Sequence, residues 1–333
     1  MKTLLYRLTL LLLTLVGLQS CLRTIEIPVL GDASGAIIRV GTPIKSANTQ
    51  TFTIDVHVVD ATGTYLGNLN KSNFAIKDTS SNPRGMSFSL IDVKGGNKTA
   101  DRGDYSAFLL LDQSGSTSAT DPNNLRIEAS RVFLDALGRN DQVALGSFTD
   151  SYYYSSRNGY TLLHGGFTNQ VSVFYPSLDS LQSIISKSST PLYTSTEWSI
   201  NYTAQKAPTK NKVVVLFTDG ENNGGSNKTN TENLSLQKNV PIFTVGLSNG
   251  VNFDVLNSLA LNTGGSFMWA KDAKQLITYF GTLGNLLHGN ADYYTLTFQA
   301  TANSFSTNGQ LLYLQVTLPN GKKFLMPYII RFA

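Results

Sequence analysis

The sequence predicts an α/β protein with a doubly wound, mainly parallel sheet that is inserted in, or flanked by, a β-sandwich. Between residues 104 and 288, short apolar strands alternate with helical segments, which is typical of an open parallel sheet covered on both faces. On either side, at 46–103 and 289–333, apolar and polar residues alternate with a period of two, as in half-buried strands. Hydrophobic residues make up 41% of the chain and charged residues only 14%, which provides for a large core and excludes a disordered chain.

The first twenty residues have the features of an export signal. Lys2 and Arg7 precede an apolar run, 8–18, that is shorter than the roughly 20 residues of a membrane-spanning helix. The run ends in Leu18-Gln19-Ser20-Cys21, and Cys21 is the only cysteine of the chain. This segment resembles a bacterial lipoprotein signal peptide, which implies that residues 1–20 are removed and that Cys21 carries lipid on its thiol. An ordinary cleaved signal that happens to contain a cysteine is the alternative.

Charge and cysteine content restrict the compartment and the partners. A sole cysteine excludes internal disulfides, so stability must come from packing. Loss of Lys2 and Arg7 with the signal lowers the formal net charge from +4 to +2, and the absence of a basic run argues against a nucleic-acid partner. Leu22 stands where inner-membrane lipoproteins carry an aspartate. We therefore expect a lipid-anchored protein of the cell envelope, in the outer membrane if the source is Gram-negative.

Two β-rich segments surround the α/β region. Residues 21–45 are expected to form a tether, and strict alternation starts at 51. The alternation returns after His288 and includes a hairpin turn at Asn320-Gly321. Since neither segment is long enough for a comfortable core of its own, we expect one shared sandwich with the α/β domain inserted in it. Two independent β segments are the alternative.

The α/β region begins with the continuous apolar run 107–111, as expected of a strand covered on both faces. A helix should follow, with Asp121 as N-cap, Pro122 in the first helical position and Gly138 at the C-terminal cap. Further strands are expected at 143–148, 213–217, 242–245 and 266–269, and further helices near 178–188, 194–205, 253–261 and 273–287.

Polar side chains follow two of these strands. Asp112 comes directly after the first strand, with Ser114 and Ser116 two and four residues later, and Asp219 lies just past another strand. Ligands of open parallel sheets bind beyond the carboxyl ends of the strands, so both carboxylates should face one crevice. Thr190 lies at a loop-to-helix junction that we expect at the same edge.

With these residues, the region 104–288 resembles a von Willebrand factor A domain. The metal-ion-dependent adhesion site of that family has the pattern Asp-x-Ser-x-Ser, then a threonine, then an aspartate. This sequence departs from the family at Ser188-Ser189, where two glycines are frequent. The positions that match the pattern are Asp112, Ser114, Ser116, Thr190 and Asp219.

An oxygen-only ligand set selects hard cations, so we expect Mg²⁺ foremost, with Ca²⁺ or Mn²⁺ as alternatives. Two carboxylates and three neutral hydroxyls leave the charge of the ion under-compensated, particularly if a carboxylate binds through water, and this favours an anionic ligand from outside. The resemblance implies that this ligand is an acidic residue of a partner protein, in adhesion or another protein–protein interaction, and that the protein is not an enzyme. The competing interpretation, a helix cap at Asp112 with turn-forming serines, explains neither Thr190 nor Asp219.

Three consecutive tyrosines are candidates for the rim of the site. Tyr152, Tyr153 and Tyr154 follow the strand 143–148 and should emerge at the same edge. Exposed tyrosines are favoured in binding surfaces, but these could equally pack on the neighbouring loop. The polar loop 221–224 is expected to be solvated only.

A serine hydrolase is the enzymatic alternative. The segment 246–250 fits the Gly-x-Ser-x-Gly nucleophile motif with Ser248 at its centre, and His164 lies in a His-Gly-Gly sequence. Asp272 and His288 follow in hydrolase order, but too little α/β sequence remains after Ser248 to complete the usual hydrolase sheet. Three histidines provide no histidine-rich metal cluster of the hydrolytic kind. A purely structural envelope lipoprotein without a cation-dependent ligand is a third hypothesis.

Overall fold

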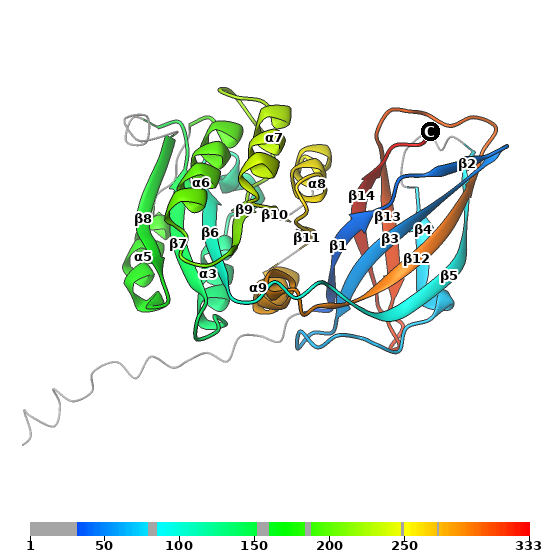
Figure 1. Ribbon diagram of the computed structural model, residues 1–333, viewed down its shortest axis with the longest axis horizontal. Coiled ribbons are helices and arrows are strands. Elements are labelled where there is room, and N and C mark those ends of the chain that lie inside the picture. Colours follow the sequence, from blue (N-terminus) through cyan, green and yellow to red (C-terminus); the bar gives the residue numbers. More distant parts are fainter. Residues whose placement is uncertain (1–31, 79–84, 152–159, 184–187, 248–249, 272) are drawn as a thin grey trace, which may run out of the picture. The chain divides into compact units, whose positions relative to one another are not determined.

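The computed structural model describes residues 32–78, 85–151, 160–183, 188–247, 250–271 and 273–333 (Figure 1). The described residues form two sheets, one of eleven strands and one of three. No helix in this part of the chain is long and apolar enough to cross a membrane.

The α/β half of the large sheet confirms the predicted fold class. Five parallel strands stand in the order β11-β10-β9-β6-β7, and β8 closes the row antiparallel to β7. The sheet is therefore mixed at this edge. The strands are β6 (Tyr105–Asp112), β7 (Gln142–Phe148), β8 (Thr161–Thr168), β9 (Asn211–Phe217), β10 (Ile242–Leu247) and β11 (Phe267–Ala270).

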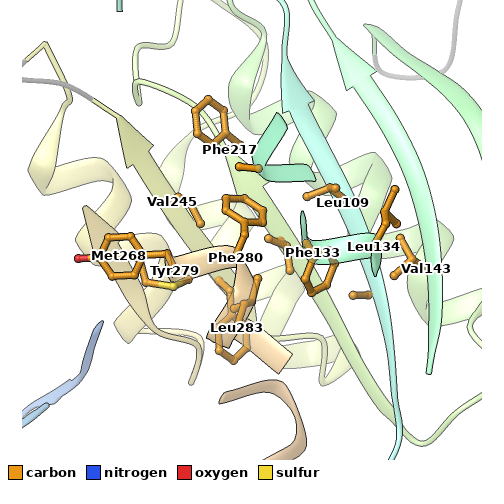
Figure 2. Packing of buried hydrophobic residues seen from close by; sticks show 14 of the residues in the cluster. Leu109, Phe133, Leu134, Val143, Phe217, Val245, Met268, Tyr279, Phe280 and Leu283 are labelled. Carbon is orange, nitrogen blue, oxygen red and sulfur yellow. The ribbon is translucent and has the colours of Figure 1, made fainter. Parts of the chain in front are cut away.

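Helices cover both faces of this half, because successive residues of the buried strands point to opposite sides. Leu109 of β6 packs in the core with Phe133 and Phe280, as Figure 2 shows, whereas its neighbour Phe108 packs on the other face with Ile200. The helical segments are α2 (Thr117–Thr120), α3 (Leu125–Asp135), η3 (Val171–Phe174), α5 (Tyr175–Ser183), α6 (Leu192–Lys206), α7 (Lys228–Lys238), α8 (Phe253–Leu261) and α9 (Ala273–His288).

The strands of the two flanking segments interleave in both sheets. In the large sheet, C-terminal β12 lies between β3 and β5; in the small sheet, C-terminal β13 lies between β14 and β4. Side chains of both sheets form one apolar cluster that includes Phe52, Tyr294 and Leu314. The bounds are β1 (Ser34–Val40), β2 (Ile44–Ser46), β3 (Thr49–Val59), η1 (Lys71–Asn73), β4 (Phe74–Lys77), β5 (Ser87–Lys98), β12 (Asp292–Thr301), β13 (Gln310–Thr317) and β14 (Lys323–Ile330).

Strand β1 makes the large sheet continuous. It pairs antiparallel with β3 on one side and with β11 on the other, where Ala36 stands opposite Met268. The buried Tyr279 hydroxyl of α9 lies 2.8 Å from Gly35 O in β1 and 2.9 Å from Trp269 O in β11. These hydrogen bonds connect α9 to β1 and to β11. The prediction of a tether over 21–45 is therefore wrong from residue 34 onward, because β1 and β2 occupy that stretch.

Several element boundaries also differ from the prediction. The helix expected at Pro122 begins at Leu125, because Asn124 has a left-handed backbone (φ 54°). Asp121 still caps it, accepting the N–H groups of Leu125 and Arg126 at 2.6 and 3.1 Å. Its C-terminal cap is Ala136 rather than Gly138. Helix α7 and strand β8 were not predicted.

Candidate functional site

Asp112 is the last residue of β6, and its side chain is completely buried. Oδ1 accepts the Ser114 N–H at 2.8 Å, which folds the chain back over the strand end. Oδ2 accepts the Thr218 hydroxyl at 2.5 Å. The hydroxyl oxygens of Ser114 and Ser116 lie 3.2 Å apart. One turn therefore presents a carboxylate and two hydroxyls at the carboxyl edge of the sheet, where the parallel strands end.

Asp219 comes from the neighbouring strand. β9 pairs in parallel with β6, so the residues that follow Phe217 emerge beside Asp112. The residue is 3% exposed, and its Oδ1 accepts the Glu221 N–H at 3.3 Å. Its Oδ2 is buried and has no hydrogen-bond partner among the residues that the structure describes. A buried carboxylate oxygen without a partner is costly, and a bound cation would satisfy it.

Thr190 reaches the same edge on the loop before α6 and is 2% exposed. Its N–H donates to Asn223 Oδ1 at 3.1 Å, and its carbonyl accepts the Asn223 N–H at 2.9 Å. The Ser188 carbonyl accepts the Gly115 N–H at 2.9 Å, so this loop is bonded directly to the turn after Asp112. The structure thus brings the three predicted segments together, even with serines in place of the usual glycines.

Two contributors were missed by the sequence interpretation. The polar loop 221–224 is not merely solvated, because Asn223 bonds both the N–H and the carbonyl group of Thr190. In addition, Asn222 Oδ1 accepts the Tyr193 N–H at 3.4 Å. Thr218, directly before Asp219, supplies the hydroxyl that fixes the Asp112 carboxylate. The available signal was the run of polar residues beyond β9, which does not reveal which of them bond.

The electrostatics of the site favour a bound cation. Burial, followed by repulsion from Asp219, raises the pKa of Asp112 to about 6, and hydrogen bonds from Ser114 and Thr218 oppose this rise only in part. Two carboxylates that lie close together and away from water each disfavour the ionised form of the other. A divalent cation among oxygen donors relieves this repulsion, and the donor set is that of Mg²⁺, Ca²⁺ or Mn²⁺. The residues present therefore fit such an ion.

Cation affinity should consequently depend on pH. Because the raised pKa of Asp112 makes a proton compete with the ion, we expect the apparent affinity for Mn²⁺ to fall by about tenfold per pH unit below roughly pH 6. Calorimetric titration with Mn²⁺ at about pH 5 and about pH 7.5 measures this change. Equal affinity at the two pH values would contradict a role for the Asp112 carboxylate.

A buried polar network supports the turn after Asp112. The Gln113 side chain donates to Leu181 O at 3.0 Å and accepts Arg126 Nε–H at 3.0 Å. The Arg126 guanidinium also pairs with Asp121 at 2.8 Å, and both side chains are at most 3% exposed. The turn is thereby connected to α3 and α5 through buried charged and amide groups that satisfy one another's hydrogen bonds.

Ser248, the nucleophile of the hydrolase alternative, lies outside the described residues, so only the positions of His164 and His288 bear on this alternative. His288 ends α9 and contacts Gly103 O and Asp141 Oδ2 at 3.1 and 3.0 Å, at the edge where the parallel strands begin. Leu247 ends β10 at the opposite edge, about 20 Å away for a strand of this length. A nucleophile and its base must lie within hydrogen-bond reach.

His164 is engaged elsewhere. It lies on β8 with Nε2 2.7 Å from Ser147 Oγ, and burial lowers its pKa to about 4, which keeps the ring neutral. The three tyrosines 152–154, Asp272 and the lipidation candidate Cys21 also lie outside the described residues.

A second group of ionisable side chains lies at the edge where the strands begin. Ligand atoms of Asp104, Asp141 and His288 lie within 4.8 Å of one another. Asp141, however, already accepts the N–H groups of Tyr105 and Gly138 at 3.1 and 2.9 Å, in addition to its contact with His288. These bonds account for the group as an anchor between α9 and the starts of β6 and β7.

Comparison with known proteins identifies the α/β part. The sequence profile of the von Willebrand factor type A domain matches residues 108–281, which is more than half of the chain. No curated protein sequence matches the chain.

Several solved structures are similar. A von Willebrand factor type A protein from Catenulispora acidiphila is 11% identical with a TM-score of 0.46, covering 94% of this chain and 76% of its own. Proximal thread matrix protein 1 from the mussel byssus, whose MIDAS (metal-ion-dependent adhesion site) motif is occupied by zinc, is 16% identical with a TM-score of 0.41. The match covers 57% of this chain and 49% of that protein. The pilus adhesin SpaC from Lactobacillus rhamnosus GG is 10% identical with a TM-score of 0.42, and the match covers 88% of this chain and 47% of the adhesin. The chain spans about half the length of the last two.

Proposed function

The chain belongs to the von Willebrand factor type A domain family, and on that premise we propose that it binds a protein ligand through a divalent cation. The observation that carries the proposal is the buried Oδ2 of Asp219, which lies beside the carboxylate of Asp112 and has no hydrogen-bond partner within the described part of the chain. The residues that would hold the ion are Asp112, Ser114, Ser116, Thr190 and Asp219. When bound, the ion supplies a Lewis-acidic position for an outside ligand.

The protein residues prepare the site for an acidic partner. Thr218 and the Ser114 N–H orient the Asp112 carboxylate, and Asn223 fixes the loop of Thr190. The neutral hydroxyls add ligands without adding negative charge, so a divalent ion that binds one of the two carboxylates through water retains attraction for an anion. An aspartate or glutamate of another protein meets this requirement. The family consists mostly of adhesion and interaction modules, which agrees with a binding role rather than an enzymatic one.

We also propose that the protein is located in the cell envelope. The apolar run 8–18, followed by Cys21 as the sole cysteine, supports a lipid anchor at that thiol. An anchor there would keep the binding site outside the cytoplasm, and an outer-membrane position is our expectation for a Gram-negative source. Replacing Cys21 with serine should move the protein from the membrane fraction to the soluble fraction; continued membrane association would contradict a lipid anchor at that residue.

Cation-dependent capture tests the binding function. Protein immobilised without its signal is exposed to envelope extract with Mg²⁺ or with EDTA, and bound proteins are identified by mass spectrometry. We expect a partner that is retained only with Mg²⁺ and is lost in the Asp112→Ala variant. Ser116→Ala and Ser118→Ala form a matched pair, because Ser118 is exposed and its hydroxyl donates to Gly115 O, 2.8 Å away.

The outcome separates the competing functions. Loss of capture with Ser116→Ala but not with Ser118→Ala supports the cation site. Capture that is unchanged by EDTA and by Asp112→Ala would refute cation-dependent binding and favour a structural lipoprotein. Esterase activity that disappears in Ser248→Ala would favour the hydrolase instead.

A further inference from the structure

A cleft of about 700 Å³ lies where the start of α8 and the end of β11 meet β13 and β14. This volume is in the range of sites that bind small ligands or side chains. Four aromatic residues, two lysines and two glutamines contribute to its lining: Phe253, Trp269, Tyr313, Phe324, Lys271, Lys323, Gln275 and Gln315.

The cleft lies at the same edge of the sheet as the candidate cation site. The Asn252 N–H donates to the Asp219 carbonyl at 2.7 Å, and the next residue, Phe253, lines the cleft. Trp269 and Lys271 are at the carboxyl end of β11, two strands away from β9. Since neighbouring strands lie about 4.8 Å apart, Asp219 and the end of β11 are separated by roughly 10 Å, the length of three or four extended residues.

The walls of the cleft suit a ring or a large aliphatic side chain. The ring of Phe253 stands edge-on to Trp269 and to Tyr313, with centroids 5.8 and 6.3 Å apart. Trp269 is 8% exposed, so it is held firmly while part of it faces the cleft. Edge-to-face aromatic arrangements of this kind accept a further ring with a favourable contribution beyond area burial.

The rim of the cleft carries positive charge. Lys271 and Lys323 are exposed, and neither makes an ion pair within the part of the chain that the structure describes. The carboxylate that also lines the cleft, Asp32, lies 3.9 Å from a different lysine, Lys322. Gln275 Oε1 accepts the Lys271 N–H at 2.9 Å, which fixes the backbone from which that lysine extends. An anion attached to an apolar group therefore matches both the walls and the rim.

We propose that this cleft is a second subsite for the protein partner and takes an aromatic residue flanked by acidic residues in an extended segment. The inference rests on the proposed function for its choice of a protein ligand. An acidic segment can place one carboxylate toward the site of Asp112 and Asp219 and, a few residues along the chain, pack a ring against Phe253 and Tyr313. Charge complementarity with Lys271 and Lys323 selects against basic segments.

Tripeptides in EDTA test the cleft separately from the cation. The chain has two tryptophans, so Trp198→Phe leaves Trp269 as the only tryptophan reporter, and Trp198 packs on Phe108, away from the cleft. Acetyl-Glu-Phe-Glu-amide is expected to change the Trp269 fluorescence saturably with a Kd of roughly 1 mM, whereas acetyl-Lys-Phe-Lys-amide and acetyl-Glu-Ala-Glu-amide should bind about tenfold more weakly. The double variant Lys271→Glu/Lys323→Glu should reverse the preference between the two charged Phe peptides.

Each result decides the proposal. Equal affinity for the acidic and basic peptides, an unchanged preference in the double variant, or no saturable signal would overturn it. Binding of a glucuronate oligosaccharide that depends on both lysines, without binding of the tripeptide, would also overturn it in favour of an acidic glycan.

The variant Asp112→Ala should bind the tripeptide as the parent protein does. Suppose that the tripeptide binds to this variant, but that the parent protein captures no partner from envelope extract in Mg²⁺. The cation-dependent function is then refuted, whereas peptide binding by the cleft is retained. If capture succeeds and the tripeptide does not bind, only the second subsite is refuted.

Discussion

Replacing Arg126 with alanine is expected to lower the free energy of unfolding by about 3–5 kcal/mol, since breaking a buried ion pair leaves an uncompensated charge in the interior. Arg126 and Asp121 are 3% and 1% exposed, and their closest atoms are 2.8 Å apart. The same guanidinium donates to Gln113 Oε1 at 3.0 Å, so the variant also leaves a buried amide oxygen without this donor. Urea unfolding followed by tryptophan fluorescence measures the loss.

Arg131 on the same helix is the matched control. It pairs with Asp179, which is 53% exposed, and its guanidinium lies 5.3 Å from the Tyr175 ring centre. The Arg131 side chain is 14% exposed and its partner is open to solvent, so Arg131→Ala should cost only about 1–2 kcal/mol. Arg126→Lys should resemble Arg126→Ala more than the parent protein, because an ammonium group cannot reproduce the planar fork that reaches both Asp121 and Gln113. Equal losses for Arg126→Ala and Arg131→Ala would contradict the supporting role of the network.

Replacing Asp112 with asparagine is expected to stabilise the cation-free protein near neutral pH while removing its stabilisation by Mg²⁺. Burial and Asp219 raise the pKa of Asp112 from 3.8 to about 6. The folded state therefore binds more protons than the unfolded state between these values, and cation-free stability falls as the pH rises through this window, by about 3 kcal/mol at most. Asparagine carries no charge and keeps one acceptor oxygen, so a net gain of about 1–2 kcal/mol at roughly pH 7.5 is expected.

Thermal unfolding in EDTA and in Mg²⁺ checks both parts of this prediction. In EDTA at about pH 7.5, Asp112→Asn should unfold at a higher temperature than the parent protein, and the difference should shrink at about pH 5. Mg²⁺ should raise the midpoint of the parent protein only. A variant that is less stable than the parent in EDTA at both pH values would show that the Asp112 charge is already compensated without a cation.

The elements that the sequence predicts well are those with a clear apolar pattern. The runs 107–111 and 213–217 are apolar throughout because both faces of β6 and β9 are covered by helices. Helix α7 was missed because only Thr231 and Ser235 are buried, so it has no apolar stripe at helical spacing. The edge strand β8 contains Gly165 and Gly166, which weaken a strand pattern.

Strand β1 was missed for a different reason. Its adjacent residues Ala36 and Ile37 are both buried, Ala36 in the core of the α/β half and Ile37 in the core of the sandwich. A strand shared by two cores loses the alternation that marks a half-buried strand. Sequence periodicity therefore indicated a tether where the chain joins the two halves of one sheet.

The candidate site shows the same limit. The sequence pattern and the family resemblance pointed to five candidate oxygen ligands, because strand ends and spacing place them at one edge. The partners that orient these ligands depend on tertiary contacts between distant segments, as for Thr218 with Asp112, or Asn223 with Thr190. Spacing along the chain carries no information about which of several polar residues in a loop makes such a bond.

Calorimetric titration of Mn²⁺ into the parent protein and into Asp219→Ala, at about pH 7.5, tests the cation site most directly. His288→Gln is the matched control, because His288 belongs to the group of ionisable residues at the opposite edge of the sheet. We predict one bound ion per chain in the parent protein and in His288→Gln, and none in Asp219→Ala. Undiminished binding in Asp219→Ala, or no binding in the parent protein, would contradict the site.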